Sequence, residues 1–346
     1  MTFPEIPLAA WRSLYDAAIK FKGASCWDWM YDDNIFGIQN PHTREIGYAC
    51  IMGNLGELYA LNVYLGADGF AGYKRILEQM DDENDDFSIM HHQHCLQAAF
   101  VDRQELAKED LQIIKNLGYR FRGADAWPQF RNYYPAYFPW YLEQAEVEYL
   151  TLAIEQTLDV ALRFKDDPSI LTPPDSDAYL TRTAHFEGER LIWKDEYLMP
   201  PAEEIPVASE CEVDEIRIRR IKEGMPKHRG IWQVDMSLYP APVREGSERP
   251  YFPYIFIVMD SVTQMALTTH LCPPGNQVGE FCNAFLEYIE KNGAIPERVE
   301  VNKDVIADML KPLAEALRFN LIVKKRLTCA EDFLQSLCMA VEKGFR

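Results

Sequence analysis

The order of apolar segments after residue 230 constrains the fold of this chain more than any other feature. The first three segments are short and apolar, which predicts strands over 230–242, 251–262 and 264–272. Helical and extended patterns then alternate, as helix 276–293, strand 298–302, helix 305–319, strand 320–326 and helix 328–344. Short strands that alternate with helices predict right-handed crossovers on a mixed sheet. We therefore expect an α/β domain with the element order βββαβαβα.

Three runs within this region carry a resemblance. WQVD (232–235), YIFIVMDSVT (254–263) and IPERVEVNKD (295–304) stand in the order found in ribonuclease H-like domains. More narrowly, they look like the cores of retroviral-type integrases and transposases. The resemblance covers about 230–344, a third of the chain. It implies a ribonuclease H-like α/β fold for residues 212–346 and suggests phosphodiester chemistry.

That chemistry needs carboxylates from neighbouring strands and a helix that together hold two divalent ions about 4 Å apart. The candidates are Asp235 on the first strand, Asp304 after the fourth strand and Glu331 on the last helix, with Asp235 and Asp304 as the ligands of Mg²⁺ or Mn²⁺. Asn302 stands where the second carboxylate belongs, and an amide lacks the charge and the bridging capacity that two hard cations require. Glu331 can equally cap its helix as the partner of Thr328.

Two functions follow from this pattern. A degenerate domain without a cofactor predicts a non-catalytic binding or interaction protein, which is the interpretation we favour. The alternative is a nuclease or transposase-like enzyme that depends on a divalent metal.

A second resemblance covers the whole chain. FKGASCWDWM (21–30), MGNLGELYALNVYLG (52–66), VDRQEL (101–106) and YFPWYL (137–142) resemble a family of uncharacterised bacterial two-domain proteins. That family implies an architecture and no activity. The Pro-rich segment from residue 199 reads as a linker. We expect an α+β domain of helices and β-hairpins over 1–198, a linker over 199–211, and the ribonuclease H-like domain over 212–346.

The N-terminal part holds a helix near its start and two predicted hairpins, 46–66 and 179–198. Between them, residues 127–141 contain eight aromatic residues and three prolines, which exclude a regular helix and predict a long loop. Trp127, Arg131 and Trp140 could bind a small ligand there, since aromatic faces and guanidinium groups hold bases and anions. Packing of the rings against the core is the other interpretation.

Histidine and cysteine suggest one further site. His91, His94 and Cys95 would share a face of a helix, where they could bind a transition metal, although a surface or capping role explains them too. The eight cysteines form no C-x-x-C pair. We expect all of them to be free thiols that serve as small apolar residues in a reducing compartment.

The charge distribution and the N-terminal sequence limit the expected cellular location and the expected binding partners of the protein. Residues 1–205 hold 17 Lys and Arg against 34 Asp and Glu, whereas residues 206–346 hold 18 against 20. Nucleic acid is therefore an improbable partner of the first part and a possible one of the second. The start of the chain lacks a signal-peptide pattern, so we expect a cytoplasmic protein that does not bind membranes. Its partner would be a protein or a small ligand, and the basic runs at 217–229 and 324–326 would suit an acidic one.

Overall fold

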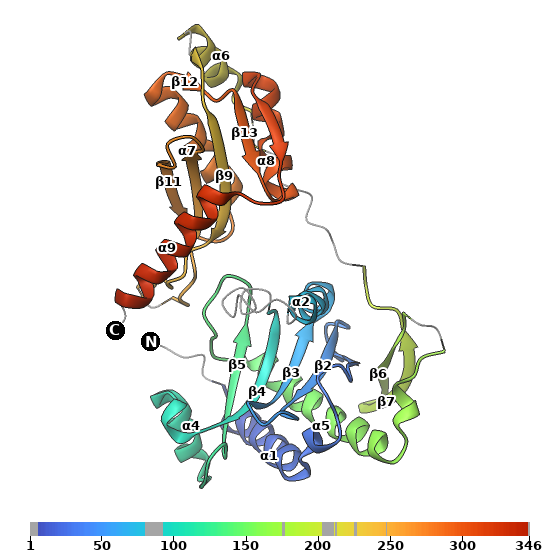
Figure 1. The fold of residues 1–346 in the computed structure, drawn as a ribbon. Coiled ribbons are helices and arrows are strands. Elements are labelled where there is room, and N and C mark those ends of the chain that lie inside the picture. The colour runs from blue at the N-terminus through green and yellow to red at the C-terminus, as the bar shows by residue number, and fades with distance from the viewer. Residues whose placement is uncertain are drawn as a thin grey trace. The chain divides into compact units, whose positions relative to one another are not determined.

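The computed structural model describes residues 6–79, 93–174, 177–202, 211, 213–224, 227–246 and 248–344. The chain forms two compact units. Unit 1 comprises Met1–Pro135 and Pro139–Glu204, and unit 2 comprises Ala136–Phe138 and Ile205–Arg346. Both units are mixed assemblies of helices and sheets (Figure 1). In the described part of the chain, every helix is too short or too polar to cross a bilayer.

Unit 1 is built on a seven-stranded sheet with the order β5-β4-β3-β2-β1-β6-β7. All neighbouring strands are antiparallel except β1 and β6, which are parallel. The two predicted hairpins are confirmed as the pairs β2–β3 and β6–β7. The strands are β1 (Phe36–Gln39), β2 (Ile46–Met52), β3 (Tyr59–Leu65), β4 (Cys95–Val101), β5 (Trp127–Tyr133), β6 (Tyr179–Glu187) and β7 (Arg190–Leu198).

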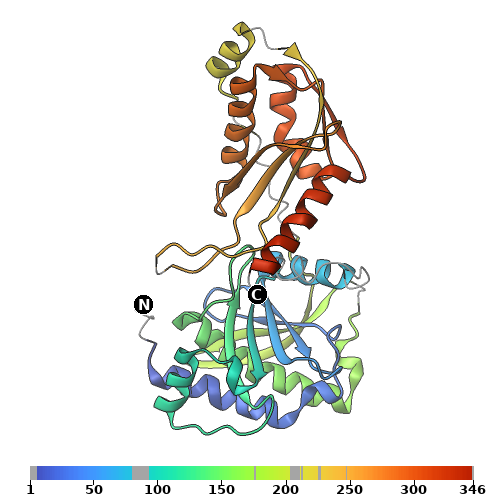
Figure 2. The ribbon, with the colours of Figure 1, turned by 60° about the vertical axis from the view of Figure 1, so that its left-hand side comes forward.

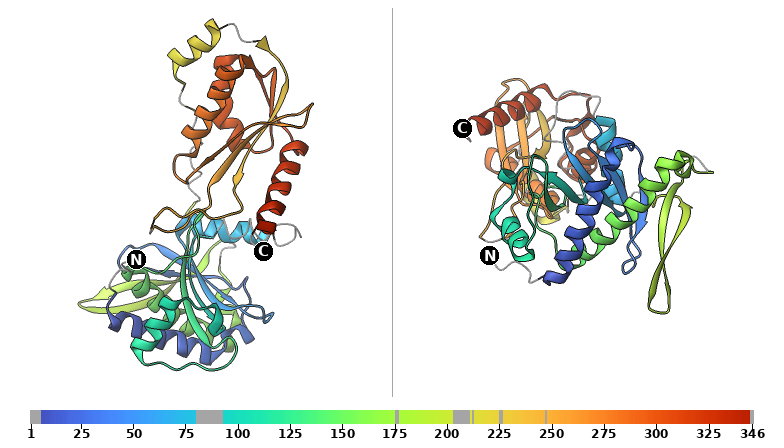
Figure 3. Two further views of the ribbon diagram at one scale, coloured as in Figure 1. Left: turned by 90° about the vertical axis from the view of Figure 1, so that its left-hand side faces the viewer. Right: turned by 90° about the horizontal axis from the view of Figure 1, so that it is seen from below.

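Helices cover both faces of this sheet. α1 and α5 lie side by side on one face and α2 lies on the other (Figures 1 and 3). The close approach of α5 requires glycine at residue 47, because a Cβ atom there would collide with the Tyr149 hydroxyl. That hydroxyl donates a hydrogen bond to the Ile38 carbonyl at 2.7 Å. The helices are α1 (Leu8–Ala24), α2 (Gly66–Gln79), α4 (Lys108–Leu117) and α5 (Gln144–Asp166), with 3-10 turns at Cys26–Asp28, Arg103–Glu105 and Pro168–Leu171.

Two expectations for unit 1 were wrong. The aromatic stretch begins as strand β5, so it is not a loop throughout, and its side chains alternate between more and less buried positions. Cys95 begins strand β4, where it is fully buried, and does not lie on a helix. In both places tertiary pairing with a neighbouring strand prevailed over the local pattern.

Unit 2 is built on a five-stranded sheet with the order β11-β10-β9-β13-β14. β9 lies at the centre, antiparallel to β10 and parallel to β13, and β13 is parallel to β14. The second and third predicted strands pair as the antiparallel hairpin β10–β11. The strands are β9 (Ile231–Leu238), β10 (Tyr254–Asp260), β11 (Ala266–Cys272), β13 (Arg298–Val301) and β14 (Asn320–Val323), and two short strands, β8 (Lys227–His228) and β12 (Ala294–Ile295), pair separately.

The helices of unit 2 sandwich this sheet. α7 (Gln277–Asn292) and α8 (Asp304–Leu317) pack on one face and build the main core of the unit. α9 (Thr328–Gly344) crosses the opposite face over β9 and β10 (Figure 2). α6 (Glu215–Glu223) packs against α8 through two buried isoleucines.

The expectation that all cysteines are free was also wrong. Cys211 and Cys282 form a disulfide across 71 residues of chain, with their Cα atoms 5.9 Å apart. Free thiols are present at Cys26, Cys50, Cys95, Cys272 and Cys329. Spacing along the sequence did not reveal the pair, because it is made by the packing of the segment before α6 against α7.

Candidate functional site

The alternation of β9 divides its side chains between the two faces of the sheet. Trp232 and Val234 point into the core beneath α7 and α8. Gln233 and Asp235 therefore face the side of α9, and Gln233 accepts a hydrogen bond from the Cys329 backbone N–H at 3.0 Å. This second face carries the acidic residue that the sequence marked as the first metal ligand.

Lys303 occupies the space beside that carboxylate. Its Nζ lies 2.8 Å from Asp235 Oδ1, 2.7 Å from the Met236 carbonyl oxygen and 3.3 Å from Ser237 Oγ. An ammonium group has three N–H donors, so all of them have acceptors here. The side chain of Asp235 is only 4% exposed, whereas that of Lys303 is 41% exposed and reaches in from the surface.

Glu300 on β13 is a second buried carboxylate of the same face, and sequence reasoning missed it. Its side chain is 2% exposed and lies 2.8 Å from Lys324 Nζ and 3.1 Å from Arg298 Nε. Gln233 Nε2 donates to its other oxygen at 3.4 Å. The signal in the sequence was a charged residue at an inward position of a short apolar strand, which is rare without a partner.

The other expected ligands have different roles. Asp304 is the exposed first residue of α8. Glu331 accepts hydrogen bonds from the Leu327 backbone N–H at 3.0 Å and from Arg326 Nη2 at 2.9 Å, and these contacts lower its pKa below the ordinary value. It thus serves the start of α9 through Leu327 and not through Thr328 as expected. Asn302 Oδ1 is buried and has no hydrogen-bond partner within the described residues.

These side chains do not fit a two-cation site. Among the residues that the structure describes, no three carboxylates, histidines or cysteines are grouped to hold a metal. Asp235 and Glu300 are instead matched by the positive charges of Lys303, Arg298 and Lys324. A divalent ion would have to displace Lys303 from three acceptors before it could bind Asp235, and Asn302 would offer it no second charge.

The aromatic candidates of unit 1 are engaged with the protein itself. Arg131 donates two hydrogen bonds to Asp110, at 2.9 and 2.6 Å, and its guanidinium lies 4.8 Å from the centre of the Tyr141 ring. The Trp127 ring packs against that of Phe121 with their centroids 5.7 Å apart. Trp140 pairs with β5 through its backbone. This arrangement matches the packing interpretation of the segment.

The histidine–cysteine candidate is not assembled as a helical face. Cys95 lies inside β4, and burial raises the pKa of its thiol above the ordinary value. The ring of His94 meets that of Tyr134 edge-on at 4.9 Å. His91 lies outside the described residues. His94 precedes the strand and Cys95 is fully buried within the sheet, and neither belongs to a metal-binding group among the described residues.

Comparison with known families matches both parts of the chain to domains without an assigned activity. Residues 11–182 match the model of a domain of unknown function (DUF7309), and residues 217–338 match that of another domain of unknown function (DUF6930). The two matches fit the uncharacterised two-domain family that the sequence motifs resemble. A comparison with curated proteins finds no match.

Proposed function

We propose that unit 2 is a degenerate ribonuclease H-like domain and that the chain is a non-catalytic binding or interaction protein. The sheet order supports this fold: the first of its five strands is central, the next two extend the sheet on one side as antiparallel neighbours, and the last two extend it on the other as parallel ones. Helices between the parallel strands and on both faces agree with it.

The observation that carries the functional part is the position of Lys303. Asp235 lies on the central strand, where the first metal ligand of such a domain belongs, and the Lys303 ammonium fills its coordination space. Metal-dependent hydrolysis requires a divalent ion that polarises the phosphate and activates water. An ammonium ion supplies positive charge, but it does not coordinate a water molecule and lower its pKa as a divalent ion does. The buried carboxylate of Asp235 is therefore neutralised by Lys303, and not by the divalent ion that hydrolysis requires.

The charges at the end of β14 favour an anionic partner. Lys324, Lys325 and Arg326 follow one another there and are exposed to differing degrees, and Lys324 and Arg326 are paired with Glu300 and Glu331. Basic side chains at such a strand end attract acidic protein segments or a nucleic-acid backbone, and nearby carboxylates keep the attraction moderate. We propose an acidic protein segment as the partner, because the strong negative charge of residues 1–205 repels a long polyanion such as nucleic acid more than a short acidic segment. We also propose a cytoplasmic location.

The catalytic part of the proposal is tested with purified full-length protein and supercoiled DNA in the presence of Mn²⁺. We expect no nicking by the wild type beyond that of the Asp235→Ala variant, and no change of melting temperature when Mn²⁺ is added. Nicking that Asp235→Ala abolishes would refute a non-catalytic domain and favour the metal-dependent nuclease.

The binding part is tested by fluorescence anisotropy with a labelled polyglutamate peptide and a labelled single-stranded oligonucleotide at low and physiological salt. We expect the peptide to bind and the Lys325→Glu variant to weaken it about tenfold, as a charge reversal within a patch does. Stronger binding of the oligonucleotide would make nucleic acid the partner. Failure of both probes at low salt would contradict an anionic partner.

A further inference from the structure

The disulfide between Cys211 and Cys282 links the segment that precedes α6 to helix α7. Cys211 lies just before α6, and Cys282 lies in the second turn of α7. The two residues are 3% and 4% exposed and belong to the main core of the unit. A Cα separation of 5.9 Å is in the usual range of protein disulfides, so the bond forms without a movement of the backbone.

The bond adds a covalent link to a segment that is also held by non-covalent contacts. The Cys211 backbone N–H donates to the Met309 carbonyl of α8 at 3.2 Å. Farther along, Arg217 donates to Glu290 at 2.9 Å and to Asn283 at 3.1 Å, both on α7. α6 itself has nine residues, which is too short for a stable helix without tertiary support. The disulfide adds a covalent bond to these non-covalent contacts.

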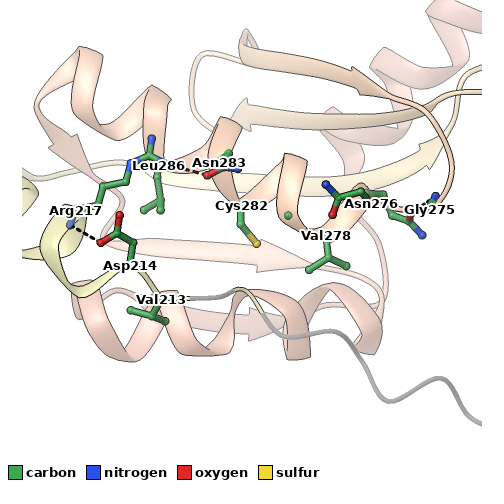
Figure 4. Close-up of a pocket in the computed structure, with 11 residues that line it drawn as sticks. Val213, Asp214, Arg217, Gly275, Asn276, Val278, Cys282, Asn283 and Leu286 are labelled. Carbon is green, nitrogen blue, oxygen red and sulfur yellow. Dashed lines mark hydrogen bonds between the residues drawn. The ribbon is translucent and has the colours of Figure 1, made fainter.

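A pocket of about 600 Å³ lies beside the disulfide, between the start of α6 and the first turns of α7 (Figure 4). Its wall on the α6 side includes Val213 and Arg217, and its wall on the α7 side includes Val278 and Cys282. The pocket is large enough for a low-molecular-weight thiol. Cys282, which is 4% exposed, is one of the residues that line it.

We propose that Cys211 and Cys282 form a reversible thiol–disulfide switch, which small thiols reach through this pocket and which links helix α6 to α7 when oxidised and releases it when reduced. A thiolate entering the pocket attacks Cys282 Sγ, the bond between the two protein sulfurs breaks, and Cys211 leaves as a thiolate that takes up a proton. A second thiol then attacks the mixed disulfide, which yields the free Cys282 thiol and an oxidised dimer of the small thiol. The protein gains two electrons and two protons, and two small thiols lose them.

The switch is independent of the proposed loss of catalysis. It also accounts for a disulfide in a chain that contains free cysteines such as Cys26 and Cys50, since a pair that opens and closes does not require an oxidising compartment. In the reduced state the hydrogen bond to the Met309 carbonyl on α8 still holds Cys211 in the core that also contains Cys282, so the two thiols can pair again.

Hydrogen–deuterium exchange of the full-length protein tests the switch, with and without dithiothreitol. Without reductant, peptide mapping should recover Cys211 and Cys282 as a cross-linked pair. On reduction we expect exchange over Glu215–Glu223 to accelerate about tenfold or more, because the segment loses its covalent anchor. The Cys282→Ser variant should exchange like the reduced protein under both conditions. Cys338→Ser, which changes a cysteine of the same unit and leaves the Cys211–Cys282 pair intact, should keep the response of the wild type.

Variants of the pocket wall test the route. Val278→Phe, and Gln277→Trp in case the first variant fails to fold, should slow reduction by dithiothreitol several-fold, since a larger side chain narrows the approach to Cys282. A wild-type protein without the cross-linked pair would overturn the proposal. So would equal exchange over α6 in the oxidised and reduced forms, or reduction of both wall variants at the wild-type rate.

Discussion

Replacing Lys303 with methionine tests the charge balance of unit 2 most directly. Methionine keeps much of the length of the side chain and removes the ammonium with its three hydrogen bonds. Asp235 would then be a carboxylate with 4% exposure and no cationic partner. Breaking a buried ion pair by removing one member costs about 3–5 kcal/mol. Because Lys303 is 41% exposed and its charge is partly screened, we expect about 2–3 kcal/mol.

Differential scanning calorimetry measures this loss as a shift of the transition of unit 2. For a domain of this size, a loss of about 2–3 kcal/mol corresponds to a melting temperature that is about 5–12 °C lower. Addition of Mn²⁺ should recover part of the shift in the variant only, since removal of the ammonium exposes the carboxylate to a competing cation.

Two further variants separate the energetic contribution of the Asp235–Lys303 ion pair from the contributions of the two side chains taken singly. Asp235→Asn should cost less than Lys303→Met, because a half-exposed ammonium can turn to water whereas a buried carboxylate cannot. The double variant should be more stable than Lys303→Met alone, because no buried charge remains. If Lys303→Met unfolds within 0.5 kcal/mol of the wild type (about the error of such a comparison), or if Asp235→Asn is the more damaging change, our account of this pair is wrong.

Three other predictions concern unit 1. Arg131→Met should lower the free energy of unfolding by about 3–5 kcal/mol in urea denaturation, because Asp110 would remain as a buried charge with 7% side-chain exposure; Arg131→Lys should recover only part, since an ammonium cannot make both parallel hydrogen bonds. Gly69→Ala should lower the melting temperature although alanine favours helices, because its Cβ would lie 2.6 Å from the His94 carbonyl oxygen. Burial tends to raise the pKa of Asp195, but hydrogen bonds from two arginine side chains lower it overall, so its contribution to stability is present above the unfolded pKa of about 3.9 and is lost as the pH falls through the folded value. Urea titrations from pH 6 to 3 should therefore show a shallower loss of stability for Asp195→Asn; an unchanged slope would argue against this assignment.

Much of the fold of both units follows from local patterns. The strands and helices after residue 230 were predictable because their apolar residues recur with the period of a strand or of a helix, and because the chain between them is short. The two hairpins of unit 1 were predictable for the same reason. Strand β4 and strand β5 were missed because each is stabilised by pairing with its neighbour and carries residues that are not typical of strands, such as Pro128 and Gln97.

The amino-acid sequence alone identified polar residues whose burial needs a structural explanation. Asp235 and Asn302 in otherwise apolar surroundings already indicated a site with reduced capacity for metal. The cation that neutralises Asp235 is known from the tertiary structure, because Lys303 lies 68 residues away and reaches Asp235 only when β13 pairs with β9. The same holds for Glu300 and for the Cys211–Cys282 bond. Each of these contacts joins residues that are separated in the sequence. The spacing of residues along the chain does not show which of them the folded core brings together.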